Sequence, residues 1–346
     1  MPPIADNWHP VPDLTPLRKL SAKLGANLDL VQAGGGNTSL KDNGTLWVKA
    51  SGKWLARAMQ EDMFLPVLQQ DILRRMDQDE EYIEEYTTES GESLRPSVET
   101  SMHAVLPHRI VLHVHSVRTI AWAIRTDMPA ALSDRLAGLR WEWIPYIHPG
   151  LILGKEIRSR LSSKPDVLIL GNRGLVVAAD DCDSAEALLQ DVERRLECPV
   201  RAPQPAGIDG LARVVPAGFR IAPDAEVHAL ALDSFSVEVA TRGTFYPDQC
   251  VYVGPALALH HNIAGFVHQF GVLPKVLLAP GKGVLVANDL NRAGREVLIS
   301  LKRVIERLHP AIAVRTLEAA EVSRLINWDA EKYRIALANR YEMEHP

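Results

Sequence analysis

The stretch RIVLHVHSV, residues 109–117, constrains the fold most, because it sets two histidines one residue apart within an apolar run. On a β-strand, residues i and i+2 point to the same face. His113 and His115 are therefore expected to project side by side, while Leu112 and Val114 face the core. Such a pair suits two imidazoles that converge on one metal ion, but two hydrogen-bonded core histidines would satisfy the same pattern.

Helix and strand patterns alternate in the first 200 residues, which predicts an α/β fold. The expected strands are 45–50, 109–114 and, as a hairpin around a Gly-Asn-Arg-Gly turn, 166–179. The expected helices are 15–25 and 184–197, the second with Asp183 or Ser184 as its N-cap.

The segment CPVRAPQPAGIDG, residues 198–210, is the clearest break in the chain, because it holds three prolines and two glycines. It predicts a larger domain over 1–203 and a small α/β domain over 204–346. In the second domain, strands are expected at 249–254, 275–281 and 283–287, and helices near 289–308 and 316–340.

The composition excludes several classes of function. A formal net charge of -5 without a basic run argues against a general affinity for nucleic acid. The sequence has neither an export signal at its start nor an apolar run of about 18 residues, so no membrane association and a cytoplasmic location are expected. The three cysteines lack CxxC spacing and are expected to be free thiols.

Two further polar motifs lie before the histidine strand. In PSVETSMH, Ser97 is expected to cap a short helix, with Glu99 in its first turn and His103 one turn later. An acid at a helix N-terminus is also favoured by the helix dipole, so a purely structural role is open. In AGGGNTSLK, residues 33–41, glycines allow backbone N–H groups to converge on an anion, although a plain turn is the more common explanation of such a motif taken alone.

Taken in order, the motifs GGGNTSLK, WVKASGKWL, PSVETSMH, RIVLHVHS and LILGNRGLVVAA resemble the class II aldolase/adducin family over residues 12–200. The resemblance implies an α/β/α sandwich around a central, mainly antiparallel sheet. It also implies a divalent ion, usually zinc, that is held by the two histidines and by a third in a later turn. Self-association into a homo-oligomer is expected by resemblance only.

The resemblance also implies roles for individual residues. Glu99 falls on the catalytic glutamate of the family, and His113 and His115 fall on metal ligands. A sugar phosphate would be held by the glycine loop and by residues of two neighbouring motifs, namely Gly36, Asn37, Ser51, Gly52 and Ser97.

The chain departs from the family pattern at Arg173, which stands where the third metal histidine is expected. A guanidinium stays protonated and has no lone pair to donate, so it cannot be a metal ligand. Three alternatives follow. His148 or Glu99 completes the metal site; Arg173 replaces the cation by pairing with Glu99 or by holding a substrate oxyanion; or the pocket is chemically silent.

The function that the resemblance implies is that of a metal-dependent aldolase-type lyase, or a related epimerase or dehydratase. The substrate would be a ketose phosphate or a similar hydroxy-ketone. The alternative is a catalytically silent binding or scaffold protein, as in adducin. The segments TRGTFYPDQCVYVGP and INWDAEKYR of the second domain resemble the C-terminal extension of longer rhamnulose-aldolase-like members.

Overall fold

The structure is a computed structural model that describes residues 12–82, 84–87, 93–201 and 210–344. Its largest unit is a seven-stranded sheet with the order β3-β2-β1-β6-β9-β8-β7, in which only β7 and β8 pair in parallel. The strands are β1 (Asn37–Asp42), β2 (Thr45–Lys49), β3 (Phe64–Leu68), β6 (Ile110–Val114), β7 (Trp141–Ile144), β8 (Val167–Leu170) and β9 (Gly174–Ala179). A separate two-stranded ribbon consists of β4 (Tyr86–Thr87) and β5 (Ser93–Leu94).

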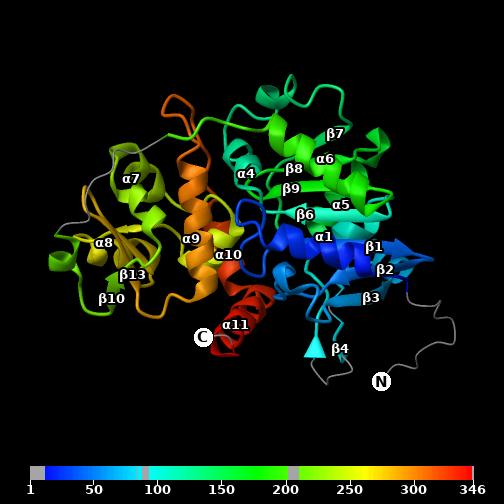
Figure 1. Ribbon diagram of the computed structural model, residues 1–346, viewed down its shortest axis with the longest axis horizontal. Helices are drawn as coiled ribbons and strands as arrows, with labels where there is room; N and C mark the ends of the chain where they lie inside the picture. Colours follow the sequence, from blue (N-terminus) through cyan, green and yellow to red (C-terminus); the bar gives the residue numbers. More distant parts are fainter. Residues whose placement is uncertain (1–11, 83, 88–92, 202–209, 345–346) are drawn as a thin grey trace.

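Helices cover both faces of this sheet (Figure 1). One layer consists of α1 (Thr15–Gly25), α4 (Val117–Ala123) and α6 (Cys182–Arg195), and the other of α2 (Gln69–Asp77), α3 (Thr100–Val105) and α5 (Leu151–Ser159). Leu20 of α1 and Leu189 of α6 share one apolar core with the sheet, and Ile72 of α2 and Met102 of α3 share the opposite one. The expected α/β/α sandwich with a mainly antiparallel sheet is confirmed.

Strand β6 lies between β1 and β9, and all five of its residues are buried. Leu112 and Val114 belong to the core beneath α1 and α6, whereas Val111 belongs to the core beneath α3. The alternation that the sequence predicts is therefore confirmed. It directs His113 toward the α3 side, and His115 follows directly after the strand.

The C-terminal part of the molecule, residues 210–344, has its own four-stranded sheet with the order β10-β13-β12-β11. Its strands are β10 (Phe219–Ile221), β11 (Ala258–Leu259), β12 (Val276–Ala279) and β13 (Gly283–Ala287), and its helices are α7 (Ser234–Ala240), α8 (Ile263–Phe270), α9 (Arg292–Ile305), α10 (Ala319–Asn327) and α11 (Asp329–Glu344). Helix α9 packs against α4, and Ile120 and Val297 share one core cluster. The two parts are thus joined by continuous apolar packing.

Three predictions of local structure need correction. The expected strand at 249–254 is a π-helical turn, Gln249–Val253, because this segment buries all its side chains and packs against α9, α10 and α11 instead of pairing in a sheet. The expected helix at 316–340 is two helices separated at Trp328, which has extended backbone angles. Helix α6 begins at Cys182 with Asp181 as its N-cap, because the Asp181 side chain accepts a hydrogen bond from the Ser184 backbone N–H.

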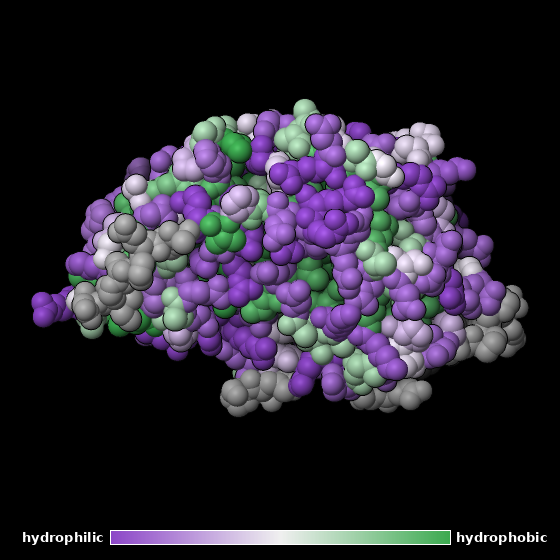
Figure 2. Space-filling view, turned by 45° about the horizontal axis from the view of Figure 1, so that its top comes forward, coloured by the Kyte–Doolittle hydropathy of each residue, from purple (hydrophilic) through white to green (hydrophobic). Residues whose placement is uncertain are grey.

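The predicted domain boundary at 203/204 lies outside the described residues, so the division into 1–203 and 204–346 stays a prediction. The molecular face in Figure 2 is mainly hydrophilic, with apolar residues in small groups between polar ones. Within the described ranges, none of the helices is both long enough and apolar enough to cross a membrane.

Candidate active site

The two histidines are placed side by side, with ring centroids 5.0 Å apart. His113 is completely buried, and its Nδ1 lies 3.0 Å from the backbone carbonyl oxygen of Leu175 on β9. Since a carbonyl oxygen only accepts, Nδ1 carries the proton and Nε2 keeps its lone pair. Nε2 is buried without a hydrogen-bond partner among the described residues. Burial lowers the pKa of His113 to about 4, so its imidazole is neutral near pH 7.

Glu99 faces the same space and is 2% exposed. Its Oε2 lies 3.5 Å from Nε2 of His113 and accepts a hydrogen bond of 2.6 Å from the side-chain amide of Asn37. The N-cap of α3 is Glu99 and not Ser97 as expected, because the helix begins only at Thr100, so Glu99 precedes the first turn in which it was expected. The Ser97 hydroxyl accepts from the Glu99 backbone N–H at 3.2 Å.

Arg173 is the second charged group at this point and is 8% exposed. Its Nε and Nη2 donate to Oε1 of Glu99 at 2.7 and 2.5 Å. Burial by itself raises the pKa of Glu99, but the positive charge of Arg173 and the proximity of His113 outweigh it and hold that pKa well below its usual range. The Arg173–Glu99 pairing is the contact that the second alternative for the missing histidine predicts.

The turn between β8 and β9 sets the orientation of the Arg173 side chain. Asn172, at φ 52°, donates from its side-chain amide to the backbone carbonyls of Phe245 at 2.9 Å and Arg315 at 3.0 Å. Asparagine tolerates this left-handed conformation better than most residues. The C-terminal part therefore fixes the turn, and Arg173 keeps one nitrogen, Nη1, buried and without a partner in the described structure.

The glycine loop, residues 34–36, also lines the pocket. At Gly36, φ is +61° and an added Cβ would lie 3.0 Å from the His113 carbonyl oxygen, so glycine is needed for conformation and for close approach. Lys49 holds the loop from behind by donating to the carbonyls of Gly34 at 2.8 Å and Lys53 at 2.5 Å. Burial lowers the pKa of the Lys49 ammonium to about 7.

The C-terminal part closes the pocket. Oδ2 of Asp248 lies 2.8 Å from Nδ1 of His115, and Oδ1 of Asp248 accepts from Arg334 of α11 at 3.0 Å. Arg334 also donates to both carboxylate oxygens of Glu331, at 3.0 and 2.9 Å. All of these charged groups are buried. The pocket that results has a volume of about 30 Å³.

The pocket brings together most of the residues that the sequence singled out. Its lining includes Gly36, Asn37, Ser51, Gly52, Ser97, Glu99, His115 and Arg173, together with Tyr246, Asp248 and Arg334. His113 does not line it, although its Nε2 lies 3.5 Å from Glu99. His148 does not line it either. Its ring packs on Trp328 with centroids 4.8 Å apart, and its Nδ1 lies 3.5 Å from a carboxylate oxygen of Glu321.

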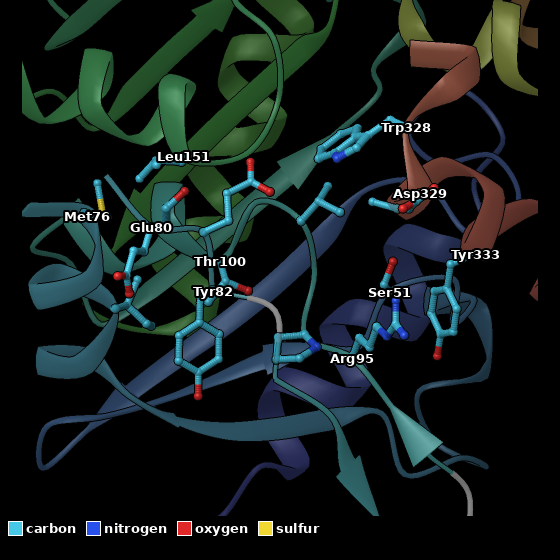
Figure 3. Close-up of a pocket in the computed structure, with 16 residues that line it drawn as sticks. Ser51, Met76, Glu80, Tyr82, Arg95, Thr100, Leu151, Trp328, Asp329 and Tyr333 are labelled. Atoms are coloured by element: carbon cyan, nitrogen blue, oxygen red, sulfur yellow. The ribbon is translucent and has the colours of Figure 1, made fainter. Parts of the chain in front are cut away.

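A second cavity of about 330 Å³ adjoins this pocket and shares Ser51 and Val98 with it (Figure 3). Aromatic side chains reach it from both parts of the molecule, Tyr82 on one side and Trp328 and Tyr333 on the other. Ser51 and Val98 thus line both the small polar pocket and the larger cavity.

The profile of the class II aldolase and adducin N-terminal domain family matches residues 17–200. The chain belongs to this family. A curated relative, the uncharacterized oxidoreductase YuxG of Bacillus subtilis (strain 168), is 29% identical over 192 residues, which are 49% of this chain. The chain spans only 28% of the length of that relative.

Two solved structures illustrate the similarity. The N-terminal class II aldolase domain of a conserved protein from Thermoplasma acidophilum is 27% identical, covers 55% of this chain and 96% of its own, and has a TM-score of 0.44. L-fuculose-1-phosphate aldolase from Thermus thermophilus is 16% identical, covers 53% of this chain and 89% of its own, and has a TM-score of 0.38.

Class II aldolases generally use a divalent metal ion, and the two histidines of this family member are the residues that would hold one. Both histidines are held through Nδ1, and Nε2 of His113 has no hydrogen-bond partner in the described part of the chain. This is how metal-binding imidazoles are oriented in proteins. Imidazole nitrogens are donors that zinc takes, and Glu99 lies 3.5 Å from that of His113.

A third metal ligand is missing among the described residues. Within the described ranges, no group of three or more His, Cys, Asp or Glu side chains is arranged to hold a metal ion. Arg173 already pairs with Glu99, and its charge opposes a second cation nearby. The protein therefore offers two ready ligands where zinc usually takes three.

The match to the family ends at residue 200, so Tyr246, Asp248, Glu331 and Arg334 lie outside the family domain. Sequence reasoning missed all four as site residues. The segments that carry them, TFYPDQC and DAEKYR, are visible in the sequence, but only the fold brings position 248 to position 115. In the sequence, the local sign of a site was the dipeptide Pro247-Asp248, which directly precedes a mainly apolar run.

Proposed function

We propose that this protein is an aldolase-type lyase that cleaves or forms the carbon–carbon bond next to the carbonyl group of a hydroxy-ketone. Membership of the class II aldolase family supports aldolase-type chemistry. One observation carries the proposal for this chain: the buried Glu99 carboxylate stands 3.5 Å from an imidazole nitrogen that has no hydrogen-bond partner among the described residues. A ketose phosphate is the substrate that the family resemblance favours.

We propose that His113 and His115 hold a divalent ion, most simply zinc, through their Nε2 atoms. The bound ion would supply Lewis acidity to the oxygens of the hydroxy-ketone. With two protein nitrogens, the remaining positions are left for Glu99 or for oxygens of the substrate. His148, which the sequence offered as a third ligand, lies outside the pocket lining.

Glu99 is the proposed proton carrier. In the cleavage direction, the Glu99 carboxylate takes the hydroxyl proton, the carbon–carbon bond breaks to give an aldehyde and an enediolate, and Glu99 then delivers that proton to the enediolate carbon. Arg173 keeps Glu99 ionised and in place through its Nε and Nη2. The unpartnered Nη1 of Arg173 is then available as a donor to an oxygen on which negative charge develops.

The remaining residues would bind the rest of the substrate. Gly36, Asn37, Ser51, Gly52 and Ser97 surround the polar pocket and are proposed to hold the phosphate. Binding energy gained there holds the reacting carbons in place. The adjoining cavity has room for the part of the substrate that leaves as the aldehyde (Figure 3).

The decisive experiment combines metal analysis with a retro-aldol screen. Purified protein, supplied with zinc, is assayed for aldehyde release from a panel of ketose phosphates. We expect turnover of at least one substrate, and a loss of about 10²- to 10⁴-fold for Glu99→Gln. Identical product formation with Glu99→Gln would contradict the role of Glu99. Thermal unfolding of both proteins checks that the variant is folded.

A silent binding domain is the second candidate, and one observation favours it: Arg173 neutralises the only carboxylate that contacts His113 among the described residues. This candidate predicts ligand binding without turnover and no metal at His113 and His115. Homo-oligomer formation and a cytoplasmic location stay predictions from the sequence. Analytical ultracentrifugation would test the former.

A further inference from the structure

The two histidines are anchored from different parts of the chain. Nδ1 of His113 meets the Leu175 carbonyl within its own sheet, whereas Nδ1 of His115 meets the carboxylate of Asp248, 133 positions further along the chain. Asp248 is 2% exposed and lies outside the family domain. The orientation of the second imidazole therefore depends on the C-terminal part.

The chemistry of the partners decides where the His115 proton sits. Oδ1 of Asp248 accepts from the permanently charged guanidinium of Arg334 at 3.0 Å, so the buried carboxylate is paired with a cation and is ionised. An ionised carboxylate only accepts hydrogen bonds, so Nδ1 of His115 must carry a proton. In the neutral ring Nε2 then keeps the lone pair.

Asp248 is itself held in place. Its Oδ1 accepts from Arg334, and Arg334 is fixed by both carboxylate oxygens of Glu331, one turn earlier on α11. On the other side, a Cβ added to Gly35 would lie 2.8 Å from both Asp248 Oδ2 and His115 Nδ1. The glycine loop therefore closes directly over the Asp248–His115 pair.

Joining the two parts does not require this contact. The Ala33 backbone N–H donates to Glu296, Asn172 donates to two C-terminal carbonyls, and Arg303 pairs with Asp29. Each of these contacts bridges the parts without touching either imidazole. The Asp248 contact differs from them because its carboxylate is hydrogen-bonded to a ring nitrogen of His115, which lines the pocket.

We propose that Asp248 is a positioning residue: it fixes His115 in the Nδ1–H tautomer and so makes the C-terminal part an obligatory component of the active site. The tautomer assignment stands on the hydrogen bonds alone, whereas its catalytic consequence rests on the proposed function. Carboxylates that orient a histidine in this way commonly affect metal affinity or activity by about 10- to 100-fold.

The substitution Asp248→Asn tests the proposal sharply. Arg334 only donates, so the Asn carbonyl oxygen must face Arg334, which turns the Asn NH₂ group toward His115. Nδ1 of His115 then has to accept, and the proton moves to Nε2. The shape of the pocket is conserved, but the nitrogen that faces the substrate changes from acceptor to donor.

The readout is the imidazole ¹⁵N spectrum of the histidine-labelled, metal-free protein at pH 8, with the His115 signals identified by their loss in His115→Gln. We expect the Nδ1–H tautomer in the wild type and the Nε2–H tautomer in Asp248→Asn. Asp224→Asn is the matched control, because it breaks a carboxylate–arginine contact with Arg295 in the same part of the chain, away from the pocket. This control should leave His115 unchanged.

Titration with Co²⁺, followed by its visible absorption, gives a second readout that does not need turnover. We expect Asp248→Asn to weaken Co²⁺ binding by about 10- to 100-fold and Asp224→Asn to leave it unaltered. An Nε2–H tautomer in the wild type, or the same tautomer in wild type and Asp248→Asn, would overturn the proposal. The expected tautomers without lyase activity would instead count against the proposed function alone.

Discussion

The two walls of the pocket differ in how they are built. The wall formed by Glu99 and Arg173 comes from neighbouring elements of one sheet and its helical layer. His113, which Leu175 on the adjacent strand orients, contacts Glu99 of this wall. The opposing wall, formed by Asp248 and Arg334, reaches His115 from the C-terminal part. The first kind of wall follows from strand pairing, whereas the second exists only when distant segments pack correctly.

The largest expected effect comes from removing the arginine of either wall. Arg334→Met would leave two buried carboxylates, Asp248 and Glu331, without their cation, and Arg173→Met would leave only Glu99. Breaking a buried ion pair costs about 3–5 kcal/mol. We expect losses of that order in the free energy of unfolding in urea, with the larger one for Arg334→Met. A negligible change in the free energy of unfolding for both variants would show that these buried ion pairs do not stabilise either wall.

Acid should weaken the sheet wall through His103. Its Nδ1 is hydrogen-bonded to Ser39 at 2.7 Å and its Nε2 to Asn37, and burial lowers its pKa from 6.5 to about 3. The unfolded chain therefore binds the proton first, so stability is complete above pH 6.5 and is lost as the pH falls toward 3.

Between pH 7 and 4.5 the loss due to His103 is expected to be about 2–3 kcal/mol. His103→Gln should flatten this part of the stability–pH curve in urea unfolding, and substitution of the exposed His261 by Gln should leave it unchanged. A variant whose curve keeps the full wild-type slope would argue that other groups cause the acid sensitivity.

Restoring an imidazole at the turn tests what the sheet wall lacks. Arg173→His removes a positive charge beside Glu99 and adds a third nitrogen donor, so zinc affinity should rise by about 10-fold or more. Calorimetric titration of the metal-free protein measures this change. An affinity equal to that of the wild type would mean that the turn does not point toward the two histidines.

The smallest effect is expected at the contact between Arg303 and Asp29, which also bridges the two parts of the molecule. Its side chains are 25% and 31% exposed, and solvent screens such pairs. Asp29→Asn should lower the free energy of unfolding by about 1 kcal/mol or less in urea. A loss as large as that of Arg334→Met would show that burial does not determine how much each ion pair contributes to stability.

The same contrast explains what the sequence could predict. Helix α1, strands β2 and β6 and the β8–β9 hairpin were predicted because their patterns depend on neighbours in sequence. The pairing of Glu99 with Arg173 was foreseen as one of the alternatives, since both motifs were already visible. Asp248 was missed because its role appears only when residue 248 meets residue 115 in space.

The wrong prediction at 249–254 has a related cause. Val251, Tyr252 and Val253 have the composition of a strand, but they fill the space between helices, where no strand is available to pair with among the described residues. A periodicity read along the chain cannot reveal which partner a buried segment will meet. Tertiary packing decided this segment, as it decided the wall formed by Asp248.

The hydrogen bonds of Asn172 have a consequence for how such a chain could change over generations. Because its amide ends on the backbone of Phe245 and Arg315, the direction of the adjacent guanidinium is set by two loops encoded far downstream. If a gene fusion supplied a foreign C-terminal segment, the α/β/α sandwich would remain but the orientation of the Arg173 side chain would be lost. The two segments are therefore expected to be inherited together, as one unit of recombination.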